Sequence, residues 1–151
     1  MYKRQDASLQ AALSLSQAAE FVDKYPEKAA HPIAQLGRNV SGGQKQRLSI
    51  ARALARTPEI LIFDDSFSAL DYKTDATLRE GLAKELPGTT KIIVAQRIST
   101  IRNADQILVL DRGEIAGLGT HDALMASCTV YREIAMSQLS EEELKKGGAS
   151  K

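Results

Sequence analysis

Two stretches decide the fold of this chain: Asn39-Val40-Ser41-Gly42-Gly43-Gln44 and Ile60-Leu61-Ile62-Phe63-Asp64-Asp65. Ser41 and Gln44 have the spacing of a capping box, in which the serine hydroxyl accepts from the glutamine amide and the glutamine side chain returns to the serine amide. We therefore predict a helix that begins just after Ser41. The continuous apolar run Ile60–Phe63 predicts a buried strand that ends at Asp64.

The capping box leaves Gly42 and Gly43 unexplained. Glycine costs up to about 1 kcal/mol relative to alanine within a helix, and it is tolerated where a backbone must approach another group closely. A helix start with free amides and a serine hydroxyl is suited to binding an anion. We interpret Ser41, Gly42, Gly43 and Gln44 as a phosphate-binding element.

The remaining pattern alternates helices and strands, as in α/β proteins. We predict a helix capped by Asp6, a connecting loop at 24–38, the helix after Ser41 ending near Arg56, and a last helix at 131–138. Between them we predict a strand–helix–strand unit (60–63, 72–86, 92–95), a β-hairpin (106–118) and a short helix capped by Thr120. The first helix should carry one apolar face: Ala11, Leu15, Ala18, Ala19 and Val22. The two strands should be covered by helices on both faces.

The composition sets bounds on function. The chain has 43% hydrophobic and 26% charged residues, a mixture typical of a globular domain, and a formal charge of +1. No block of like charge suggests binding to nucleic acid or to an anionic membrane surface. No apolar run approaches the roughly 20 residues of a spanning helix. Cys128 is the single cysteine, so the sequence predicts no disulfide framework or thiolate metal cluster.

The two opening stretches, followed by Lys45–Leu54 and by Ser68-Ala69-Leu70-Asp71, resemble the signature, Walker B and D-loop motifs of the ATP-binding cassette (ABC) family. The resemblance implies a partial P-loop NTPase (RecA-like) fold, with a parallel sheet core flanked by helices plus part of the ABC helical subdomain. The resemblance covers about Leu9 to Gln138. We place the partial nucleotide-binding domain at 1–138, and 139–151 read as a polar tail.

No G-x-x-x-x-G-K-[ST] phosphate loop occurs in the 151 residues. We therefore expect the half of the domain that carries this Walker A motif to be missing, and the chain alone to be inactive. Met1–Gln5 resemble a translated sequencing adapter, which suggests an artefactual beginning; an ordinary basic N-terminus is the alternative.

Family resemblance implies ATP and Mg²⁺ as cofactors. Ser41, Gly42, Gly43 and Gln44 would then grip the γ-phosphate of an ATP held by a second ABC subunit. Asp64, at the end of a strand where ligands bind in open α/β sheets, would hold the metal ion. Asp71 would make a contact across the dimer.

Two positions depart from the family pattern. Asp65 stands where the family has its catalytic glutamate, and its side chain is one methylene shorter. Gln96 stands where the switch histidine is usual, and an amide cannot carry a proton. We interpret both as parts of a degenerate catalytic site; tolerated variation in a working site is the alternative.

This combination resembles the degenerate subunit of bacterial heterodimeric multidrug-type exporters. It implies an ATPase on the cytoplasmic face of the membrane, joined to a transmembrane domain and paired with a second ABC subunit. Two alternatives stay open. One is a soluble ABC-type ATPase of DNA repair or translation, although no coiled-coil heptads or basic groove support a nucleic-acid partner. The other is a non-catalytic dimerisation remnant.

Overall fold

The computed structural model describes residues 2–138, so Met1 and the predicted tail at 139–151 lie outside the described residues. The chain divides into two compact units, Met1–Val94 and Ala95–Lys151, and each is considered by itself. Within the described part, no helix has the length and apolar character needed to cross a membrane.

The first unit opens with helices α1 (Tyr2–Leu15) and α2 (Ala19–Val22). The prediction of one helix capped by Asp6 was wrong at both ends: α1 begins before Asp6, and the chain turns after Leu15. Gln17 adopts a left-handed backbone (φ 60°) at this turn, which no continuous helix permits. The turn also breaks the predicted apolar face, since Ala11 is exposed while Ala18 is buried.

Two short 3₁₀ helices, Lys28–Ala30 and Gln35–Gly37, interrupt the connecting loop that leads to α3 (Gly42–Leu54). As predicted, α3 begins directly after Ser41. A small helical core joins α3 to the first two helices through the buried residues Leu13, Ala18, Phe21, Val22 and Ala51.

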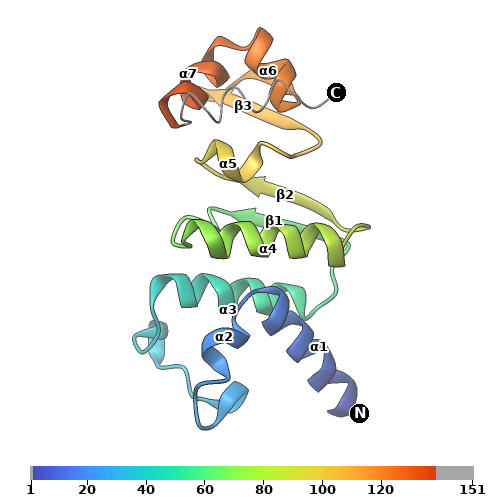
Figure 1. The fold of residues 1–151 in the computed structure, drawn as a ribbon, viewed down its shortest axis with the longest axis vertical. Coiled ribbons are helices and arrows are strands. Elements are labelled where there is room, and N and C mark those ends of the chain that lie inside the picture. Colours follow the sequence, from blue (N-terminus) through green and yellow to red (C-terminus); the bar gives the residue numbers. More distant parts are fainter. Residues whose placement is uncertain (1, 139–151) are drawn as a thin grey trace. The chain divides into compact units, whose positions relative to one another are not determined.

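The strand–helix–strand prediction is confirmed by β1 (Ile60–Asp64), α4 (Tyr72–Glu85) and β2 (Thr90–Val94). The two strands pair in parallel, with Ile60 opposite Thr90 and Asp64 opposite Val94. Figure 1 shows α4 lying along β1. Parallel strands joined by a crossover helix are the basic unit of α/β folds.

Helices cover one face of this sheet. Leu61 and Phe63 of β1 are 3% and 2% exposed and pack with side chains from α1, α3 and α4. The buried members contributed by the helices and loops are Ala12, Ile50, Leu54, Phe67, Leu70, Leu78 and Leu82.

The opposite face of the sheet is exposed within this chain, so the prediction of strands covered on both sides was wrong. Ile60, Ile62, Ile92 and Val94 are between 49% and 68% exposed. Side chains alternate between the two faces of a strand, and the helices of the first unit bury only the face of Leu61 and Phe63. The apolar character of both faces was readable from sequence, whereas the cover on each face was not.

The second unit contains α5 (Ile98–Ile101), β3 (Ile107–Asp111), β4 (Glu114–Gly119), α6 (His121–Ser127) and α7 (Thr129–Gln138). The predicted hairpin is confirmed: β3 and β4 pair antiparallel through Arg112 and Gly113, both with positive φ. Such a pair matches the right-handed twist of the flanking strands. Thr120 caps α6, as predicted, by accepting from the Ala123 amide.

A separate core holds this second unit together. Its buried members are Ile98, Ile107, Val109, Leu124, Cys128, Tyr131 and Ala135. His121 lies at the edge of this core, where its Nδ1 is 2.8 Å from the Tyr131 hydroxyl. The His121 side chain is 8% exposed and packs edge-on against the Tyr131 ring.

We predict that Leu78→Ala lowers the free energy of unfolding by about 2–5 kcal/mol, because Leu78 is fully buried and truncation leaves a cavity. Ile62→Ala is the matched control: it removes similar apolar volume from a side chain 68% exposed, so it should cost no more than about 0.5 kcal/mol. Urea denaturation of the 151-residue chain measures both. Equal losses in the two variants would contradict the assignment of the sheet's buried face.

A second prediction concerns pH. Burial, followed by the charge of Arg102, lowers the pKa of His121 below its usual 6.5. The unfolded chain therefore binds this proton more readily, so the contribution of His121 is complete above about pH 6.5 and is lost as pH falls toward the folded-state pKa. We expect wild type to lose more stability than His121→Gln between about pH 7.5 and 5.5 in urea titrations. The same pH dependence in both proteins would refute this role.

Candidate functional site

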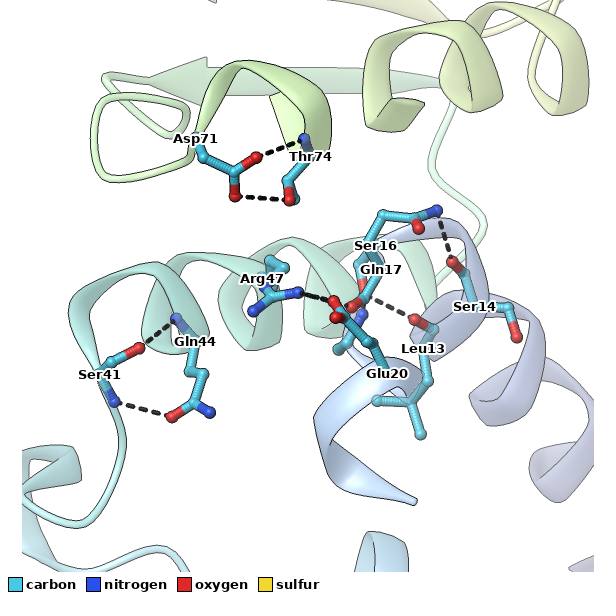
Figure 2. Close-up of polar contacts among 11 residues, drawn as sticks. Leu13, Ser14, Ser16, Gln17, Glu20, Ser41, Gln44, Arg47, Asp71 and Thr74 are labelled. Carbon is cyan, nitrogen blue, oxygen red and sulfur yellow. Dashed lines mark hydrogen bonds and ion pairs between the residues drawn. The ribbon is translucent and has the colours of Figure 1, made fainter. Parts of the chain in front are cut away.

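Ser41 and Gln44 form the predicted capping box at the start of α3. The Ser41 hydroxyl accepts from the Gln44 amide at 3.2 Å, and the Ser41 amide donates to the Gln44 side-chain oxygen at 2.8 Å. Figure 2 shows each side chain reaching toward the backbone amide of the other residue. Ser41 is exposed, so the helix starts at the surface of the first unit.

The two glycines that follow differ in what surrounds them. Among the described residues, neither the Gly42 nor the Gly43 amide has a hydrogen-bond acceptor. A Cβ added to Gly43 would lie 2.9 Å from the Ala69 carbonyl oxygen, so a neighbouring backbone requires glycine there. A Cβ added to Gly42 would meet only the Ala69 Cβ at 3.8 Å, an ordinary contact. Among residues 2–138, therefore, nothing demands glycine at position 42.

Arg47 anchors α3 one turn further along. Its guanidinium donates to the Gln17 carbonyl at 3.0 Å and to the Glu20 carboxylate at 2.9 Å, and it lies over the Phe21 ring, 4.9 Å from the ring centroid. Figure 2 shows this link between α3 and the turn before α2. These contacts fix α3 to α2 and to the turn before it, and they do not involve the exposed first turn of α3.

Asp64 and Asp65 lie at the carboxyl end of β1, as predicted, and both are exposed. Asp65 adopts a left-handed backbone (φ 47°), which aspartate tolerates better than most residues. Its amide donates to the Val94 carbonyl of β2 at 3.1 Å. The described residues contain no cluster of three or more potential metal-binding side chains. A single carboxylate still suits Mg²⁺, which proteins often hold with one or two carboxylates plus substrate phosphates.

Residues 65–70, here called the exit loop, lie against the first half of α3. Gln46 makes the contact: its side-chain amide donates to the Asp65 carbonyl (3.2 Å) and the Ser68 hydroxyl (3.1 Å), and its oxygen accepts from the Ala69 amide (3.0 Å). Sequence reasoning missed Gln46. Its partners are 19 to 23 residues away, and no local pattern signals such a contact.

Asp71 caps α4. Its two oxygens accept from the Thr74 amide (3.0 Å) and the Thr74 hydroxyl (2.8 Å), as Figure 2 shows. These hydrogen bonds lower the pKa of Asp71, so it is a carboxylate near neutral pH. An exposed carboxylate retains free lone pairs after these two bonds. The cap therefore leaves lone pairs on Asp71 for the predicted cross-dimer contact, which stays a prediction.

Gln96 belongs to the second unit, whereas the other predicted residues belong to the first. Its side chain is exposed, and its backbone carbonyl accepts a hydrogen bond from the Gln138 side-chain amide at 2.8 Å. The same Gln138 side chain accepts from the Ile98 amide at 2.9 Å. Within the first unit, the start of α3, which carries Ser41, Gly42, Gly43 and Gln44, contacts the exit loop at Ala69. Asp64, Asp65 and Asp71 lie at the two ends of that loop.

The first turn of α3 has the chemistry of an anion site. The amides of Gly42 and Gly43, the hydroxyl of the exposed Ser41 and the positive end of a 13-residue helix dipole lie together in this turn. No side chain at Gly42 obstructs approach. These groups fit a phosphate, and the carboxylates at the end of β1 fit a divalent cation.

Comparison with known proteins agrees with this chemistry. A family model described as ABC transporter matches residues 3–68. A putative ABC transporter ATP-binding protein of Mycoplasma pneumoniae is 45% identical over 135 residues, which is 89% of this chain and 22% of that protein. An uncharacterised ABC transporter ATP-binding protein of Mycobacterium tuberculosis is 53% identical over 106 residues, or 70% of this chain and 18% of that protein.

A solved structure extends the similarity to three dimensions. The chain superposes on a bacterial Atm1-family ABC exporter with ATP bound, with a TM-score of 0.86 and 36% sequence identity, over 90% of this chain and 24% of that one. The chain thus spans about a fifth of the length of the relatives it matches. In its fold and in its signature sequence alike, the chain belongs to the nucleotide-binding domains of the ABC transporter family.

Proposed function

We propose that this chain supplies the ABC signature to an ATP molecule held by a second ABC subunit. Gly42 carries the proposal, because it is an exposed glycine with a free amide, and no contact within the described part of the chain requires glycine there. A glycine at such a position is explained by close approach of a group from outside the chain. Ser41 and the amides of Gly42 and Gly43 would bind phosphate oxygens, and Gln44 would hold Ser41 in place.

The chain's own nucleotide site is proposed to be catalytically weak. Asp64 would hold Mg²⁺, which neutralises phosphate charge when ATP is bound. Asp65 would occupy the position of the general base, and its exposed carboxylate is shorter than glutamate. Gln96 would offer a hydrogen bond without a proton to transfer. ATP hydrolysis would then depend mainly on the partner's site, and the chain alone would be inactive.

In the whole protein we propose a role in export. The solved relative is an exporter, and exporters couple ATP to movement of a substrate through a transmembrane domain. This chain would accordingly act at the cytoplasmic face of a bacterial membrane, in a heterodimer whose second ABC subunit carries the competent site. Relatives named as transporters favour this proposal over a soluble ATPase of DNA repair or translation. Measurable ATP turnover by the assembled pair would separate it from a non-catalytic dimerisation remnant.

Gly42→Asp should reduce the ATPase rate of the complete transporter by at least about tenfold. The added carboxylate would repel the phosphate and remove a charge-assisted hydrogen bond worth about 1.5–3 kcal/mol. The rate is measured on the reconstituted pair, with circular dichroism and membrane assembly checked alongside.

Gly42→Ala provides the matched control for that substitution. Its methyl group meets only an ordinary contact within the chain, so folding and assembly should be normal in both variants. Near-normal turnover in an assembled Gly42→Asp pair would mean that the signature does not face a nucleotide.

Asp65→Asn should change steady-state turnover of the complete transporter by less than about threefold, because the site is already weak. Asparagine tolerates the left-handed backbone at position 65, so the exit loop is not disturbed. The same kind of change at the partner's catalytic residue should lower steady-state ATP turnover by about 10²- to 10⁴-fold. A loss of that size for Asp65→Asn would identify Asp65 as a working general base.

A further inference from the structure

Gln46 uses both ends of its side-chain amide to hold the exit loop. The nitrogen donates to the Asp65 carbonyl and the Ser68 hydroxyl, and the oxygen accepts from the Ala69 amide. All three distances lie between 3.0 and 3.2 Å, within the normal range for hydrogen bonds. One side chain thus fixes the loop at three points.

The contacts between Gln46 and the exit loop lie beside the first turn of α3. The Ala69 carbonyl approaches Gly43 so closely that a Cβ would sit 2.9 Å from it, and Gln46 follows Gly43 by three residues, about one turn along the same helix. The loop also holds Asp65 in its left-handed conformation, since the Ser68 hydroxyl donates to the Asp65 carbonyl at 3.0 Å. The signature end of α3 and the backbone of Asp65 therefore share one packed junction.

We propose that Gln46 is a positioning residue that joins the signature turn to the exit loop, so that a displacement of one moves the other. The inference rests on the proposed function, in which the signature turn binds the partner's nucleotide while Asp65 and Asp71 belong to or border the chain's own site. Gln46 touches neither nucleotide in this scheme. It links the two ATP sites mechanically, through backbone groups of the loop.

The junction has the properties that such a link requires. Gln46 is partly buried, whereas Ser68 and Ala69 are exposed, so the hydrogen bonds rather than apolar packing determine where this end of the loop lies. Phe67 and Leu70 anchor the loop to the core on its other side. These two side chains pack in the core that also contains Ile50 and Leu54 of α3, and Gln46 adds three hydrogen bonds at the end of the helix that carries the signature turn.

Hydrogen exchange on the complete transporter, comparing wild type with Gln46→Met, tests the link. Methionine keeps the length of the side chain and removes all three hydrogen bonds. Without nucleotide, the Ala69 amide should exchange about tenfold faster in Gln46→Met, while α3 beyond residue 47 exchanges as in wild type. An Ala69 amide that exchanges equally in both proteins would overturn the inference, whatever the role of the signature.

The second measurement adds Mg²⁺ and a non-hydrolysable ATP analogue. In wild type we expect both the 41–45 segment and the exit loop to gain protection; in Gln46→Met the signature segment should still respond and the loop should not. A loop that responds equally in both proteins would refute the link. Absence of any response at 41–45 in wild type would instead refute the proposed signature function.

Kinetics and two further variants complete the test. Gln46→Met should lower kcat about tenfold and leave the KM for ATP within about twofold, because Gln46 does not touch nucleotide. Gln46→Glu keeps the oxygen that accepts from the Ala69 amide and removes the donor, and it should also lower kcat. Ser49→Ala, at an exposed position on the same helix, is the control and should retain the wild-type kcat. An unchanged kcat in both Gln46 variants would refute the inference.

Discussion

The site depends on how α3 is held. Its first turn must be free at the surface, with amides unpaired, while the rest of the helix is fixed firmly enough to keep that turn in place. Arg47 provides the anchor on one side, through the Gln17 carbonyl, Glu20 and the Phe21 ring. Ile50 and Leu54 bury the other side in the core. The helix remains stable although the amides of its first turn are unpaired, because the rest of α3 is packed against the core.

The two glycines of the signature show how similar residues serve different purposes. Gly43 is required by the chain's own architecture, since the Ala69 carbonyl occupies the space that a side chain would need. Gly42 has no such neighbour and is instead suited to contact from outside. One glycine thus allows the exit loop to approach α3, and the other leaves the helix start accessible. Together they allow the exposed start of α3 and the exit loop to lie next to each other.

Strong local signals in the sequence were confirmed. The capping box, the parallel strand pair, the β-hairpin and the Thr120 cap each depend on residues close together in the chain or on a clear apolar run. The boundaries of the first helix were wrong because the turn at Gln17 depends on tertiary contacts, including the bond from Arg47 to the Gln17 carbonyl. Glutamine at position 17 gives no sequence signal for a left-handed backbone.

By itself the sequence determined the family, the helix after Ser41, the strand–helix–strand unit and the hairpin, because capping, periodicity and motif spacing are local properties. Only the tertiary structure decided which face of the sheet is buried and which of the two glycines has a neighbour. It also showed that Gln46 holds the exit loop. These depend on side chains that meet across separations of about 20 residues or more, and such distances follow from packing of the whole unit rather than from any short pattern.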